Sequence, residues 1–108
     1  MKVNIGTVIT DIKKNVIKEG FTVGEAIINI LLANYEDEVK IPGTEKLRRY
    51  TLSESIESSK SEVDLSIDDI SLIKKYLDKA GAHPILYTAI YTALEGVKQV
   101  DGNESNPS

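Results

Sequence analysis

The sequence has no cysteine and no tryptophan in its 108 residues, and it has a single histidine, His83. The absence of cysteine excludes disulfides, thiolate metal sites and cysteine nucleophiles. His83 has no second histidine with which to form a metal pair, and it stands directly before Pro84 at an expected helix start. We interpret it as a capping or packing residue of a turn.

Patterns that bind phosphates or cations are also missing. The seven glycines never form a GxGxxG or GxxxxGK pattern, which disfavours a nucleotide cofactor. Two acidic groups, residues 36–38 and the set of Asp64, Asp68 and Asp69, lack the alternating ligands and the glycine of a calcium loop. We interpret them as a solvated loop and as partners of a helix dipole. The sequence therefore predicts no cofactor, no metal and no catalytic residue, and hence a protein that is not an enzyme.

Long apolar runs are absent as well. No segment approaches the roughly 20 apolar residues of a membrane-spanning helix, and residues 1–6 lack the apolar run of a signal peptide. The net charge of −4 gives no broad attraction to a phosphate backbone. We therefore expect the chain to stay in the cytoplasm, with neither a membrane nor a nucleic acid as its partner.

Apolar residues make up 41% of the chain, which is enough to fill one core. The β-branched residues at the N-terminus alternate along the chain: Val3, Ile5, Thr7 and Ile9. This alternation predicts a strand, and a turn at residues 11–15 completes a short β-hairpin. Val63 to Leu65 could add a short third strand.

Helical spacing and caps predict four helices: Thr22–Ala33, Thr44–Ser58, Ser66–Gly81 and Pro84–Gly96. Thr22 and Glu25 have the spacing of a capping box, and Ser66 and Asp69 repeat it. Thr44 is expected to cap the second helix. The predicted fold is α+β and mostly helical, with an N-terminal β-hairpin followed by four helices.

The domain organisation follows from the composition. Residues 1–96 are expected to form a single globular domain. Residues 97–108 are almost entirely polar after Val100, so they are expected to form a disordered C-terminal tail.

The second helix has a basic cluster beside Tyr50. The cluster consists of Lys46, Arg48 and Arg49. A basic cluster next to an aromatic ring can bind a phosphate or an acidic partner, although we prefer the interpretation of a solvated helix face. The inner side of the same helix is expected to hold Leu47, Leu52 and Ile56.

Three tyrosines in the last two helices are candidate interaction residues: Tyr76, Tyr87 and Tyr91. Tyr87 and Tyr91 lie four residues apart and share one helix face, which either packs on the hairpin or forms an adhesive surface. Tyrosine is common at interface hot spots because it combines rigid apolar area with a polar tip. The first and fourth helices are apolar on nearly every turn, and this favours self-association.

The order of these elements resembles a group of small proteins encoded by tailed bacteriophages and prophages, roughly from Met1 to Gly96. The segments most alike are Thr22–Leu32, Glu45–Tyr50, Val63–Lys75 and the ending Leu94–Gly96. These segments are helix caps and core positions, so the resemblance implies no activity and no functional residue. It implies a context, the virion or the cytoplasm of a bacterial host.

Three functions are compatible with these observations. The first is a homo-oligomeric structural or assembly accessory protein that binds itself and another protein through the fourth helix, with Tyr87 and Tyr91 as anchors. The second is a small acidic inhibitor of a host enzyme or defence system, acting through Glu36, Asp37 and Glu38. The third, an enzyme with an unfamiliar site, ranks last because the carboxylates are scattered.

Overall fold

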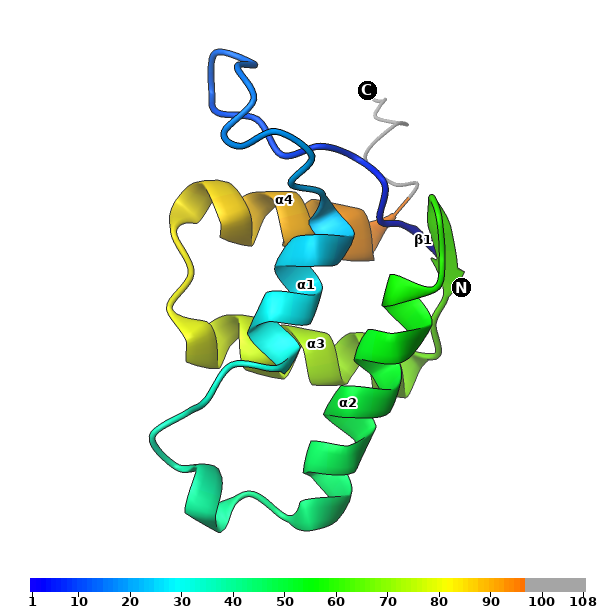
Figure 1. Ribbon diagram of the computed structural model, residues 1–108, viewed down its shortest axis with the longest axis vertical. Helices are drawn as coiled ribbons and strands as arrows, with labels where there is room; N and C mark the ends of the chain where they lie inside the picture. Colours follow the sequence, from blue (N-terminus) through cyan, green and yellow to red (C-terminus); the bar gives the residue numbers. More distant parts are fainter. Residues whose placement is uncertain (97–108) are drawn as a thin grey trace, which may run out of the picture.

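The computed structural model describes residues 1–96, and its only sheet joins the N-terminus to the middle of this part of the chain (Figure 1). Strand β1 (Lys2–Asn4) pairs antiparallel with β2 (Glu62–Asp64), and Val3 stands opposite Val63. Both valines are buried, while their neighbours in each strand are exposed. The third strand expected near Val63 is therefore present, and it is the partner of β1.

Residues 8–20, here called the N-terminal arm, fold back on themselves and project beyond the helices at the top of Figure 1. Isolated bridges join Thr10 to Val16 and Val8 to Thr22, which is the fold-back predicted for this segment. The Asp11 carboxylate closes the turn by accepting hydrogen bonds from the backbone N–H groups of residues 13 and 15, at 2.8 and 2.9 Å.

Residues 1–96 also form four α-helices and one 3₁₀ helix: α1 (Val23–Leu31), η1 (Glu38–Lys40), α2 (Gly43–Glu57), α3 (Ile67–Ala80) and α4 (Pro84–Glu95). The Thr22 hydroxyl caps α1 by accepting from the Glu25 N–H, and α3 begins with the complete Ser66–Asp69 capping box. The His83 imidazole caps α4, because its Nδ1 accepts from the N–H of residue 85 at 3.2 Å. These three predicted helix starts are confirmed.

The start and the inner face of α2 differ from the prediction. Pro42 occupies the cap position and helical geometry begins at Gly43, so Thr44 does not cap the helix. Leu47 is 65% exposed, whereas Leu52 and Ile56 are buried as expected. Leu47 precedes Leu52 by five residues, which rotates it about 140° around the helix and away from the core.

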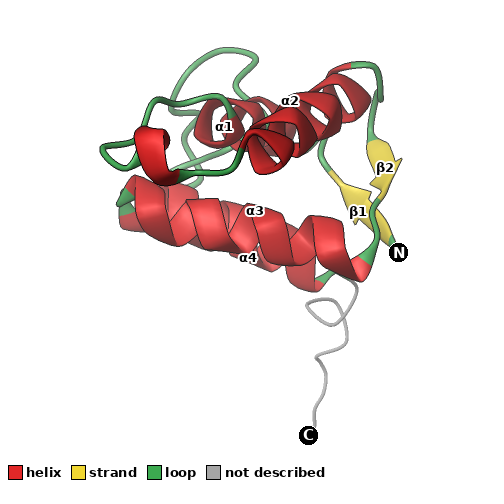
Figure 2. Ribbon diagram, turned by 90° about the horizontal axis from the view of Figure 1, so that it is seen from below, coloured by secondary structure: helices red, strands yellow, loops and turns green. Residues whose placement is uncertain are grey.

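The helices form two layers, with α1 and α2 over α3 and α4 (Figure 2). Helix α1 contacts the other three α-helices, and its residues Ile27 and Leu31 are fully buried. The fold is α+β and mostly helical, as predicted. The tail predicted at residues 97–108 lies outside the described part of the chain. Within residues 1–96, every helix is too short or too polar to cross a membrane.

Candidate functional site

Arg49 lies at the centre of a polar cluster that joins the end of α1 to α2. Its guanidinium donates to the backbone carbonyl of Leu31 at 2.7 Å and to that of Ala33 at 2.8 Å. The same guanidinium pairs with the Glu38 carboxylate at 3.1 Å. These carbonyls lie at and just beyond the end of α1, where they have no partners within the helix, so Arg49 acts as the C-terminal cap of α1.

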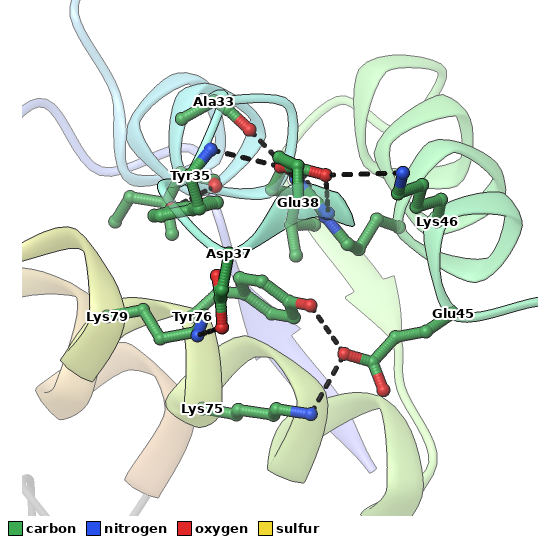
Figure 3. A network of polar contacts seen from close by, with 12 residues as sticks. Ala33, Tyr35, Asp37, Glu38, Glu45, Lys46, Lys75, Tyr76 and Lys79 are labelled. Carbon is green, nitrogen blue, oxygen red and sulfur yellow. Dashed lines mark hydrogen bonds and ion pairs between the residues drawn. The ribbon is translucent and has the colours of Figure 1, made fainter. Parts of the chain in front are cut away.

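Two tyrosine rings, whose centres are 5.3 Å apart, pack against the Arg49 guanidinium. Its central carbon lies 4.5 Å from the centre of the Tyr76 ring and 5.5 Å from that of Tyr35. The Tyr76 hydroxyl donates to the Glu45 carboxylate, which also accepts from Lys75 at 2.9 Å (Figure 3). Every charge in this cluster is thus paired within the molecule.

The ionisation of the cluster reflects this pairing. The hydrogen bond from Arg49 lowers the pKa of Glu38, and the hydrogen bonds from Lys75 and Tyr76 lower that of Glu45. Burial, together with the bond to Glu45, raises the pKa of Tyr76 to about 12. General acid–base catalysis works best with a pKa near the working pH, and these shifts all lead away from neutrality. The arrangement is suited to holding helices together.

Two of the residues considered for interaction, Arg49 and Tyr76, lie inside the described structure. Arg49 is 5% exposed and Tyr76 is fully buried, so neither can reach a partner from the folded protein. Arg48, the neighbour of Arg49, does point outward, where it pairs loosely with Asp69 at 3.7 Å. The basic cluster read from the sequence is thus divided between the interior and the surface.

Tyr87 and Tyr91 connect α4 to α3. Their rings are stacked, with centres 6.0 Å apart, and the Tyr87 hydroxyl donates to Asp78 at 2.9 Å. The Lys74 ammonium lies 4.7 Å from the centre of the Tyr91 ring. Tyr91 keeps 40% of its surface exposed, so part of this predicted interaction face remains accessible.

The acidic residues 36–38 are also largely engaged inside the molecule. Asp37 pairs with Lys79 at 2.6 Å, and this hydrogen bond lowers the pKa of Asp37 (Figure 3). The Glu38 carboxylate is paired with Arg49, so Glu36 is the one exposed residue of these three. The surface offered to a basic partner is accordingly smaller than the sequence indicated.

A groove of about 770 Å³ runs between α4 and the N-terminal segment, and its lining is mainly apolar. Helix α4 contributes Ile85, Ala89 and Ala93, and the arm contributes Val8 and Ile12. The three α4 residues are half-buried, and the fully buried side chains of α4 are Ile90 and Leu94.

Aliphatic side chains are concentrated on the arm beside this groove. Ile12 is 91% exposed, and Val8, Val16 and Ile17 are exposed as well. These four are among eleven large hydrophobic residues exposed in the described chain, although the arm holds only thirteen residues. The alternating pattern from Val3 to Ile9 predicts that Val8 points outward. The pattern ends before Ile12, so it does not predict the exposure of Ile12.

Residues 1–96 contain no group of three His, Cys, Asp or Glu side chains placed to hold a metal ion. Comparison of the chain with protein-family models, with curated proteins and with solved structures gives no match. The functional assignment therefore depends on the geometry of the described surface.

Proposed function

We propose that this protein is a non-enzymatic interaction protein that forms homo-oligomers and serves as a structural or assembly accessory protein of phage type, in the virion or the host cytoplasm. The observation that carries the proposal is the apolar groove along α4 together with the exposed aliphatic arm beside it. Burial of apolar area stabilises association by about 25 cal/mol per Å² before the cost of ordering the partners is subtracted.

A second copy of the chain is the partner that this surface fits most simply. Monomeric soluble proteins rarely expose a large continuous apolar patch, because such a patch promotes association. Here the groove and the arm lie next to each other on one surface, and a two-fold dimer requires a patch that complements itself. Tyr91 lies on another side of α4, where it remains a candidate contact for a second protein.

The acidic inhibitor has less support than this role. Asp37 and Glu38 are held by Lys79 and Arg49, so contact with a basic partner would first require these ion pairs to break. Glu36 alone gives a weak negative surface.

The solution mass of the purified protein tests the proposal. Light scattering should show an oligomer for the wild type. Thr88→Glu should shift it towards the monomer, because Thr88 is an exposed residue in the groove wall and a carboxylate there would be buried without a partner.

Ser71→Glu is the matched control. Ser71 is exposed on α3 and does not line the groove, so this variant adds the same charge elsewhere on a helix and should keep the wild-type mass. A wild type that is monomeric at all concentrations would contradict self-association. Equal masses for Thr88→Glu and Ser71→Glu would show that the groove is not part of the interface.

A further inference from the structure

Charge is distributed unevenly along the described chain. Residues 1–20 contain four lysines and two acidic residues, whereas residues 21–96 contain eight basic and thirteen acidic residues. Three of the four lysines, Lys13, Lys14 and Lys18, are on the arm and are exposed. The arm also holds Asp11 and Glu19, so its net charge is +1, and it extends from a body, residues 21–96, whose net charge is −5. Such a body on a second copy is electrostatically complementary to the arm.

The groove has two distinct ends. The charged residues of its lining are Asp11 and Lys14 on the arm, and Lys2 and Glu62 on the two strands. In Figure 1 the arm projects above the first half of α4, while β1 lies beside its last turns. The helical part of α4 is twelve residues long, so the two ends are about 18 Å apart along the helix axis.

We propose that two copies associate about a two-fold axis across the middle of this groove, so that the arm of each copy lies along the α4 groove of the other. This inference depends on the proposed self-association and specifies its geometry. A two-fold axis at that point reverses the groove, so the arm end of one copy meets the sheet end of the second. Lys14 of each copy then lies against Glu62 of the other.

The same arrangement accounts for the composition of the α4 face. Thr88, Ala89 and Thr92 are small, so the backbone of a second α4 or an arm can approach closely. Ile12, almost fully exposed in the single chain, becomes buried against the α4 of the other copy. The apolar contact supplies the affinity, and the two Lys14–Glu62 pairs fix the orientation.

A charge exchange tests this geometry. Lys14→Glu and Glu62→Lys each place like charges at both symmetric contacts, so each variant alone should associate about tenfold more weakly than the wild type. In a mixture of the two variants, every such contact again joins opposite charges. The mixture should therefore form a heterodimer with nearly the wild-type dissociation constant, measured by sedimentation equilibrium.

Glu54→Lys provides the control, since Glu54 is exposed on α2 and does not line the groove. It makes the same charge change as Glu62→Lys and should associate as the wild type does. Circular dichroism establishes that each variant is folded. If the wild type associates and both groove variants associate equally well, the reciprocal arm is wrong while self-association stands.

Two further outcomes are decisive. Variants that weaken association separately but fail to restore it when mixed would overturn the Lys14–Glu62 contact and with it the two-fold geometry. A wild type that stays monomeric would overturn both this inference and the proposed function.

Discussion

Arg49 holds the end of α1 against α2 through contacts that no other side chain of the cluster can replace. A guanidinium presents several N–H donors in one plane, which allows it to bind two carbonyls and a carboxylate at once. Its two flanking tyrosine rings exclude water from one side of these bonds. The cluster is therefore sensitive to the shape of the donor as well as to its charge.

Replacement of Arg49 should destabilise the fold strongly. Arg49→Met leaves the carbonyls of Leu31 and Ala33 and the Glu38 carboxylate without their donor, at a cost of about 3 kcal/mol in the free energy of unfolding. Arg48→Met, at the exposed neighbouring position, should change it by less than about 0.5 kcal/mol. Urea denaturation of both variants measures the difference, and similar losses for the two would refute the role assigned to Arg49.

The Tyr76 hydroxyl should make stability depend on alkaline pH. Its pKa of about 12 in the folded protein lies above the ordinary value of 10.0. The neutral hydroxyl is therefore favoured by folding, and its contribution is complete below pH 10 and is lost as the pH rises from 10 to 12. Tyr76→Phe should be less stable at pH 8 and should lose less stability over that interval than the wild type. Parallel curves for the two proteins in urea titrations from pH 8 to 12 would contradict this.

The burial of Arg49 could have been anticipated in part. Arg49 precedes Leu52 by three residues and Ile56 by seven, so it shares their helix face, whereas Leu47 does not. The cluster of basic residues from Lys46 to Arg49 suggested an exposed helix face, and the position of Arg49 on the buried face was therefore missed. Its partners were beyond prediction, because the carbonyls of Leu31 and Ala33 are backbone groups that the sequence does not distinguish.

Local signals determined most of the helix boundaries. Thr22 and Ser66 cap their helices as their spacing predicts, since capping involves residues only three apart. The pairing of β1 with β2 joins segments about sixty residues apart, and no local pattern specifies that partner. Thr44 failed as a cap because Pro42, with its fixed φ, sets the start of α2 two residues earlier.

The two threonines give a matched test of these helix starts. Thr22→Ala removes the hydroxyl that accepts from the Glu25 N–H and should cost about 1 kcal/mol of stability. Thr44→Ala removes an exposed hydroxyl within the first turn of α2 and should cost little or even stabilise, since alanine favours helix. Thermal unfolding compares them, and a larger loss for Thr44→Ala would show that α2 begins at Thr44 after all.

Taken as a whole, the molecule pairs its charges inside and exposes aliphatic residues outside. The ion pair of Arg49 joins α2 to η1, and those of Lys75 and Lys79 join α3 to α2 and to the loop before η1. The arm and the α4 groove leave apolar surface accessible. The sequence indicated more apolar residues than one small core can bury, but it did not show where on the surface the remaining ones would lie. Ile12 and Val16 are placed by the turn at Asp11, and the groove arises from the packing of α4 against a distant segment.

Hydrogen exchange of the wild-type amides, measured at dissociating and associating concentrations, tests the central claim most directly. The account predicts that amides of residues 8–20 exchange more slowly in the associated protein, because the arm is covered by the α4 groove of a second copy. Amides of α2 should exchange at the same rate in both samples. Unchanged exchange in the arm when the mass shows association, or new protection confined to α2, would contradict the account.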